Sequence, residues 1–177
     1  MPGQIPMIDR RSAPSATSAA RADRRARILV VEDHAFVRAG ILALLSGQPD
    51  LVCCGEADSI ATARAAVATQ QPDVVLLDLN LRDGQAIELI GALRLEHPDS
   101  KVLVLSQLDE SVYAPKALQA GAKGYVMKEM AADRLLDALR IVIGGKMFLS
   151  DEMASMLAVN PARTTKPNLP RAWPDKS

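Results

Sequence analysis

The stretch VVLLD at residues 74–78 places four consecutive apolar residues directly before a carboxylate. An unbroken apolar run of this length is typical of a β-strand that is buried on both faces of its sheet. Comparable short runs recur along the chain at residues 28–31, 51–54, 102–105 and 124–127. Because strands buried on both faces belong to sheets that helices cover on both sides, these five runs favour a parallel sheet.

The segments between these runs carry apolar residues at helical spacing. In the first of them, Val37, Ile41 and Leu44 recur at intervals of three and four residues, and Gly47 ends the pattern. Later segments repeat the arrangement, so strands and helices alternate five times with short connections. We therefore predict an α/β fold, a flavodoxin-like, doubly wound (βα)5 domain with a five-stranded parallel sheet.

Composition and charge exclude several classes of protein. The 177 residues include 21 Lys plus Arg and 21 Asp plus Glu, so the chain lacks the net positive charge of many nucleic-acid-binding proteins. It contains no apolar run long enough to span a bilayer and no apolar core of a signal peptide. Cys53 and Cys54 are adjacent and fit neither a disulfide framework nor a metal knuckle. We therefore expect a cytoplasmic protein without a membrane partner.

Composition also divides the chain into regions. Residues 1–27 are rich in Arg, Ala and Ser, which predicts a disordered tail, with an organelle transit peptide as the alternative. Residues 28–146 hold the alternating strands and helices, and residues 147–159 are expected to form a C-terminal linker helix. Residues 160–177 contain four prolines and little to pack, which predicts a second disordered tail.

Polar residues follow four of the five strands, where parallel strands bring their carboxyl ends together. They are Glu32, Asp33, Asp78, Ser106 and Lys128. Sites in doubly wound folds form at this edge, near the point where the strand order reverses. Each residue alone is more typical of a helix cap or a solvated loop, but caps do not explain all five together.

These residue types suit phosphoryl transfer. Three clustered carboxylates repel one another, and a divalent cation such as Mg²⁺, which prefers oxygen ligands, relieves the repulsion. The hydroxyl of Ser106 and the ammonium of Lys128 can then hold phosphoryl oxygens. Asp78 follows the central strand and is the expected nucleophile.

Four segments carry a family resemblance: ILVVEDHAFVRAGI at 28–41, PDVVLLDLNLRDG at 72–84, KVLVLS at 101–106 and AGAKGYVMK at 120–128. Together they resemble the receiver domain of a bacterial two-component response regulator. Two longer stretches, YAPKALQAGAKGYVMK at 113–128 and GGKMFLSDEMA at 144–154, are similar to receivers that usually precede a LuxR-type helix-turn-helix. The resemblance implies a phosphoprotein that acts in phosphorelay signal transduction.

The resemblance also implies roles for individual residues. Asp78 would be the phosphoacceptor, assisted by Ser106 and Lys128, and Ser106 would form a conformational switch together with Tyr125. From the residues alone, Tyr125 is instead a half-buried strand aromatic. The implied ligands of Mg²⁺ are Glu32, Asp33, Asp78 and the backbone carbonyl of Asn80.

Three positions need separate comment. His34 neighbours the acidic pair, but we interpret it as an exposed loop residue rather than a ligand. Arg82 stands where many receivers have proline, which predicts a looser loop after Asp78. Pro115 falls inside the expected fourth helix, which predicts that this helix is kinked or starts late.

The resemblance implies a signalling domain and not an enzyme, apart from assistance to its own phosphorylation and dephosphorylation. A sensor histidine kinase would be the phosphodonor, and a homodimer or a downstream protein the output. The 18 residues after 159 show no helical period, so neither a helix-turn-helix nor direct DNA binding is expected. The alternatives are a truncated or frameshifted transcriptional regulator and a Mg²⁺-dependent phosphohydrolase, although the second would require an aspartate in place of Asn80.

Overall fold

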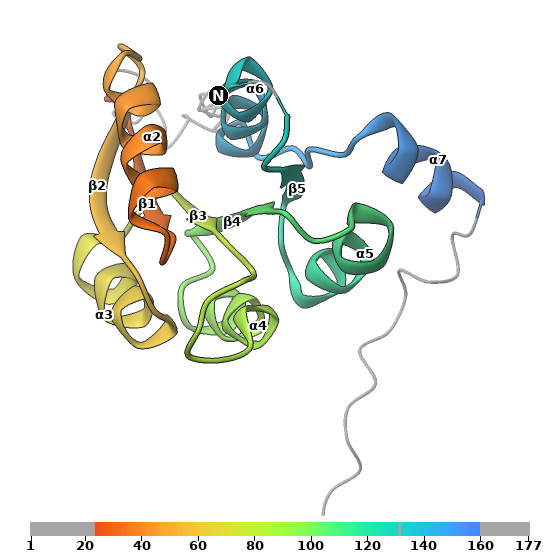
Figure 1. The fold of residues 1–177 in the computed structure, drawn as a ribbon, viewed down its shortest axis with the longest axis horizontal. Helices are drawn as coiled ribbons and strands as arrows, with labels where there is room; N and C mark the ends of the chain where they lie inside the picture. Colours follow the sequence, from red (N-terminus) through yellow and green to blue (C-terminus); the bar gives the residue numbers. More distant parts are fainter. Residues whose placement is uncertain (1–23, 131, 160–177) are drawn as a thin grey trace, which may run out of the picture.

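In the computed structural model, which describes residues 24–130 and 132–159, five strands form one parallel sheet (Figure 1). The strands are β1 (Ala26–Val31), β2 (Leu51–Ala57), β3 (Val74–Leu77), β4 (Lys101–Ser106) and β5 (Gly124–Met127). Their order across the sheet is β2-β1-β3-β4-β5. The predicted doubly wound fold with a five-stranded parallel sheet is confirmed.

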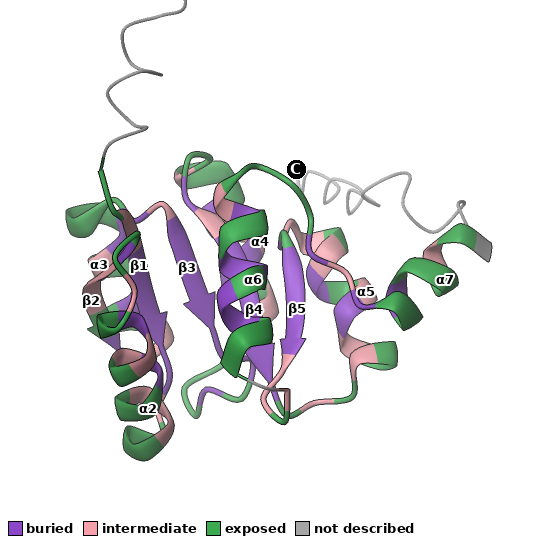
Figure 2. Cartoon of the chain, turned by 90° about the horizontal axis from the view of Figure 1, so that it is seen from above, coloured by how far each residue is buried: buried purple, intermediate pink, exposed green. Residues whose placement is uncertain are grey.

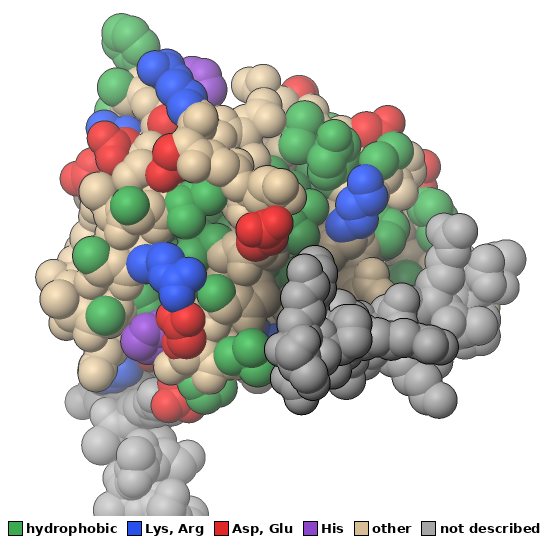
Figure 3. All heavy atoms as spheres, turned by 90° about the horizontal axis from the view of Figure 1, so that it is seen from below, with side chains coloured by type: hydrophobic (Ala, Val, Ile, Leu, Met, Phe, Trp, Pro, Cys, Tyr) green, Lys and Arg blue, Asp and Glu red, His purple; other side chains and the backbone are tan. Residues whose placement is uncertain are grey.

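Six helices accompany the sheet in the part of the chain that the structure describes. They are α2 (Ala35–Ser46), α3 (Ile60–Gln70), α4 (Ala86–Glu96), α5 (Glu110–Ala120), α6 (Ala132–Ile143) and α7 (Asp151–Val159). Helices α2 and α6 lie on one face of the sheet, and α3, α4 and α5 lie on the other (Figure 1). The outer surface of the α3, α4 and α5 layer carries acidic and basic side chains interspersed (Figure 3). Within the described residues, no helix is long and apolar enough to cross a membrane.

Alternate residues of the strands pack into two separate hydrophobic cores, one on each face of the sheet. Leu29 and Val75 pack with α3, α4 and α5, whereas Ile28 and Val74 pack with α2 and α6. All four side chains are fully buried, and the sheet is buried between exposed outer helix faces (Figure 2). Burying an aliphatic side chain of this size contributes about 1.5–3 kcal/mol, so the unbroken apolar runs are the main source of the sheet's stability.

The strand order reverses between β1 and β3. After β1 the chain moves outward to β2, and it then returns to the other side of β1 and continues through β3, β4 and β5. The last pair in the β1–β3 register is Val31 and Leu77, and the Asp78 N–H donates to the Val31 carbonyl at 3.0 Å. The residues that follow these two strands therefore lie side by side at the switch point, where doubly wound folds bind ligands.

The first strand begins at Ala26, two residues before the predicted apolar run. The Ala26 N–H donates to the Asp50 carbonyl at 2.8 Å, and the Arg27 N–H donates to an Asp73 carboxylate oxygen, also at 2.8 Å. These bonds extend the strand across residues that carry no apolar signal. Most of the first predicted tail, residues 1–23, lies outside the described residues. The whole of the second predicted tail, residues 160–177, also lies outside them.

The C-terminal helix is shorter than the expected 147–159 and begins at Asp151. Phe148 is not helical, because its backbone forms an isolated parallel bridge with Gly124 at the edge of the sheet. Helix α7 then lies against α5 (Figure 1), and Met153 is buried in the core on that side. The segment therefore packs on the domain rather than running straight out from α6.

Helix α5 runs unbroken through Pro115, so the structure shows a continuous helix in place of the expected disruption. Asp109 caps it, with a side-chain oxygen that accepts a bond from the Ser111 N–H at 2.8 Å. Proline removes the donor that the Ser111 carbonyl would otherwise use, and Ser111 is exposed to water. Solvent can satisfy that carbonyl, which explains why the helix tolerates the proline.

Candidate functional site

Three carboxylates gather at the carboxyl edge of β1 and β3. Glu32 and Asp33 follow β1, and Asp78 follows β3. A potential ligand atom from each, together with one from His34, lies within 4.8 Å of the others. Glu32 and Asp78 are almost completely buried, at 1% and 2% exposure. The predicted acidic cluster is thus brought together, in surroundings that strengthen every charge interaction.

Lys128 joins this cluster from the end of β5. Its ammonium Nζ lies 2.6 Å from Glu32 Oε2 and donates to Asp78 Oδ2 at 2.9 Å. Its backbone N–H donates to the Ser106 carbonyl at 2.9 Å, which extends the β4–β5 pairing by one residue. Lys128 therefore holds two buried carboxylates that come from different strands.

Burial and pairing shift the pKa values of these groups in different directions. Burial raises the pKa of Glu32, but hydrogen bonds from Lys128 and the His34 backbone outweigh it, so the net pKa is lowered. Burial lowers the pKa of Lys128, and its bonds to Glu32 and Asp78 more than reverse this. For Asp78, burial dominates over the bonds from Asn80 and Lys128, and the pKa is raised. The protein therefore stabilises the charged form of Asp78 less than that of Glu32.

Asp33 lies at the mouth of the cluster, where both its carboxylate oxygens are buried yet accept no hydrogen bond. The nearest cationic groups are the Arg82 Nε, 3.1 Å from Oδ2, and the His34 Nδ1, 2.9 Å from Oδ1. Neither nitrogen is aligned to donate. Buried carboxylate oxygens without donors beside two further carboxylates are the ligand set that a hard divalent cation prefers.

His34 is exposed, as predicted, but it lies close to the acidic cluster. Its backbone N–H donates to Glu32 Oε1 at 3.0 Å, and its Nδ1 lies 2.9 Å from the same oxygen. Just over half of its side chain faces solvent. The residue thus helps to orient Glu32.

Ser106 and Tyr125 meet at a shared backbone residue. The Leu108 N–H donates to the Ser106 hydroxyl at 3.2 Å, and the Tyr125 hydroxyl donates to the Leu108 carbonyl at 2.8 Å. Both side chains are buried, and burial raises the pKa of the Tyr125 phenol. The loop between β4 and α5 therefore links the strand end beside the cluster to the tyrosine. The sequence contained no signal for Leu108.

Asn80 lies beside Asp78 in the loop after β3. Its backbone N–H donates to Asp78 Oδ1 at 3.0 Å, and its side chain is exposed. Because Lys128 takes the other oxygen, each oxygen of Asp78 accepts one hydrogen bond. These two donors fix the orientation of the carboxylate.

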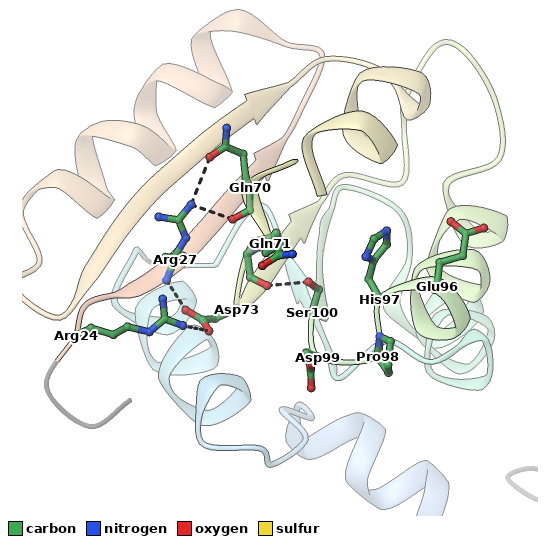
Figure 4. Close-up of a pocket in the computed structure, with 11 residues that line it drawn as sticks. Arg24, Arg27, Gln70, Gln71, Asp73, Glu96, His97, Pro98, Asp99 and Ser100 are labelled. Atoms are coloured by element: carbon green, nitrogen blue, oxygen red, sulfur yellow. Dashed lines mark hydrogen bonds and ion pairs between the residues drawn. The ribbon is translucent and has the colours of Figure 1, made fainter. Parts of the chain in front are cut away.

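A polar cavity of about 520 Å³ lies at the opposite, amino edge of the sheet (Figure 4). Three of its charged groups, Arg24, Arg27 and Asp73, bond to one another or to neighbours within the cavity wall. Arg24 pairs with Asp73 at 2.9 Å, and the Arg27 guanidinium donates to the Gln70 carbonyl at 2.9 Å. These three groups are already paired, whereas buried carboxylate oxygens without donors lie at the carboxyl edge, so we place the functional site there.

A family model described as the response regulator receiver domain matches residues 28–140. The chain belongs to this family. The matched segment covers four strands completely, β1 from Ile28 on, and the entire carboxyl-edge cluster, which confirms the resemblance seen in the sequence.

Similar proteins include receivers with longer chains. The chain is 37% identical over 131 residues to the DNA-binding transcriptional activator DevR/DosR of Mycobacterium tuberculosis, covering 74% of this chain and 60% of the relative. It is 33% identical to the nitrate/nitrite response regulator protein NarL of Escherichia coli, with 76% and 62% covered. The chain thus spans about three fifths of the length of these curated relatives.

Solved structures agree with the fold. A LuxR-family two-component response regulator from Aurantimonas sp. SI85-9A1 matches with a TM-score of 0.71 and 30% identity, covering 77% of this chain and 98% of that one. The signal receiver domain of the putative response regulator NarL from Mycobacterium tuberculosis matches with a TM-score of 0.67 and 29% identity, covering 70% and 99%.

Besides the bond between Tyr125 and Leu108, the contact of Arg82 with Asp33 was not predicted from the sequence of this receiver. The absence of proline at this position predicts only a looser loop, whereas the Arg82 guanidinium lies 3.1 Å from Asp33. An arginine four residues after Asp78 could have suggested a contact with the acidic cluster, but no local pattern indicates which way the loop turns.

Proposed function

We propose that this receiver accepts a phosphoryl group on Asp78 and uses the new charge to switch its surface. The observation that carries the proposal is the surroundings of Asp78. It is a buried carboxylate at the switch point of the sheet, with Lys128 Nζ at 2.9 Å and two further carboxylates beside it. We propose residues 28–146 as the receiver and residues 147–159 as its linker.

In the proposed reaction, an Asp78 oxygen attacks the phosphorus of a phosphorylated histidine on a sensor kinase. An aspartyl phosphate forms as the P–N bond breaks, and the released imidazole takes up a proton. Glu32, Asp33, Asp78 and the Asn80 carbonyl would hold Mg²⁺, which supplies charge neutralisation for the transferred group. The ligand-type oxygens of Asp33 that lack donors support this assignment.

Lys128 and Ser106 would then hold the phosphoryl oxygens. Lys128 already contacts Asp78, and Ser106 ends the neighbouring strand β4. A bond from the Ser106 hydroxyl to the phosphoryl group would compete with the bond it accepts from the Leu108 N–H. Because Leu108 also holds the Tyr125 hydroxyl, a shift of this loop would release the tyrosine and change the surface around α5.

The output would be a protein contact, either with a second copy or with a downstream protein. A phosphoacceptor of this kind undergoes one transfer for each signal and is not a turnover enzyme. Cys53 and Cys54 are both free and half-buried, which suits a reducing compartment such as the cytoplasm.

The experiment that tests the proposal uses a small phosphodonor. The full chain is incubated with acetyl phosphate and MgCl₂, and intact-protein mass spectrometry monitors the addition of one phosphoryl group. We expect one addition in the wild type and in Asp99→Asn, which removes an exposed carboxylate elsewhere. We expect none in Asp78→Asn. An unmodified wild type, with its fold verified by circular dichroism, would refute the proposal, as would modification of Asp78→Asn.

A further inference from the structure

Arg82 lies beside the acidic cluster, but the proposed reaction assigns it no role. Its Nε lies 3.1 Å from Asp33 Oδ2, whereas its side chain is 81% exposed. Asp33 is the opposite case, with a side chain only 6% exposed. A freely hydrated cation thus stands against a buried carboxylate at the open side of the site.

The loop that carries Arg82 is anchored by its next residue. Both oxygens of Asp83 accept a bond from the Ile60 N–H at the start of α3, at 3.0 and 2.8 Å. Gly84 follows with a φ of +153°, a conformation that side chains disfavour. The anchor and the turn hold the backbone beside Arg82, so the guanidinium is presented to Asp33 by a fixed loop.

The charges at the site show what the arginine does. In the described part of the chain, the three carboxylates of the site pair with two Lys or Arg side chains. Lys128 contacts Glu32 and Asp78, and Arg82 contacts Asp33. Lys128 is largely buried and holds two partners, so it is fixed in place. Arg82 is exposed and contacts one carboxylate, so breaking this ion pair costs little free energy.

We propose that Arg82 competes with the divalent cation for Asp33 and thereby sets the affinity of the site for Mg²⁺. A metal ion on Asp33 would meet a positive guanidinium at close range, so binding requires the arginine to swing into solvent. The inference rests on the proposed function, because it assumes that the acidic cluster binds Mg²⁺. It predicts that this receiver binds Mg²⁺ more weakly than the same site without Arg82.

The test is a titration of the full chain with MgCl₂, followed by ¹H–¹⁵N NMR through the backbone amides of Asp33 and Asp78. In Arg82→Ala, we expect the Kd for Mg²⁺ to fall about threefold to fivefold, the range of a partly exposed ion pair. Arg82→Lys keeps the charge on a shorter, more mobile side chain, and its Kd should lie between the two. The same spectra report whether each variant is folded.

Arg64→Ala is the matched control. Arg64 is an exposed arginine paired with Glu96 at the far end of α4, so its removal changes the net charge equally without touching the cluster. Its Kd should equal that of the wild type. A wild type that binds Mg²⁺ while Arg82→Ala shows the same or a higher Kd refutes the role of Arg82 alone. A wild type whose amides do not respond to Mg²⁺ refutes the metal site and the competition together.

Discussion

Replacing Lys128 by methionine tests the electrostatics of the site most directly. The substitution keeps an unbranched apolar stem and removes the ammonium that contacts both Glu32 and Asp78. These carboxylates are 1% and 2% exposed, so neither can recover its solvation by turning toward water. The variant therefore leaves two buried negative charges side by side.

The expected loss of stability is large. Removing one partner from a buried ion pair costs about 3–5 kcal/mol, and we expect about 3 kcal/mol because the methionine retains the packing of the stem. The entropy of unfolding of a domain of this size is about 0.3 kcal/mol/K, so the Tm should fall by about 10 °C. The pKa of Glu32, which Lys128 lowers in the wild type, should rise in the variant.

The assay is urea denaturation monitored by far-ultraviolet circular dichroism at pH 7.5, once with EDTA and once with MgCl₂. Because a divalent cation can replace the lost charge, Mg²⁺ should recover more stability in Lys128→Met than in the wild type. Lys123→Met is the matched control, since Lys123 is exposed at the other end of β5. A loss below about 1 kcal/mol, or one equal to the control, would show that the lysine does not compensate the buried carboxylates.

Two further predictions concern individual groups of the site. Asp78→Asn should raise the free energy of unfolding at neutral pH by on the order of 1 kcal/mol, because burial of the charged form is unfavourable. Since the folded-state pKa of Asp78 is raised above its ordinary value of 3.8, the wild type loses stability relative to this variant as the pH rises through that pKa. Urea denaturation from pH 4 to pH 8 measures the gap, and a gap that narrows as the pH rises would contradict the sign. Tyr125→Phe should lower the free energy of unfolding by about 1 kcal/mol, because it leaves the Leu108 carbonyl without its donor. An unchanged urea midpoint would show that water replaces the tyrosine at this carbonyl.

The strands and the site edge could be predicted from the sequence because both depend on local signals. The run at 74–77 is apolar throughout and is buried on both faces, as continuous patterns indicate. Once the sheet is parallel, the residue after each strand must lie at one edge. The placing of Glu32 beside Asp78 therefore followed from the alternation of strands and helices, without any information on side-chain contacts.

Contacts that depend on how a loop turns or where a terminal segment packs could not be predicted from the sequence. The reach of Arg82 to Asp33 and the bond between Tyr125 and Leu108 each join residues that no periodic pattern relates. The same is true of Met153, which is buried against the domain although α7 shows mostly exposed residues. Such contacts are set by tertiary packing, which local patterns do not encode.

The strand order explains why the cation that holds both buried carboxylates has a long side chain. Neighbouring strands lie about 4.8 Å apart, so the ends of β3 and β5, which are separated by β4, stand roughly 10 Å apart. Only a long side chain on β5 can cover that distance to Asp78, and it must pass the end of β4. Ser106 ends β4, fully buried, and its hydroxyl places a polar atom at the same edge of the sheet. A short side chain at the end of β5 would leave both buried carboxylates without a cation, so the length of Lys128 is a requirement of the strand order.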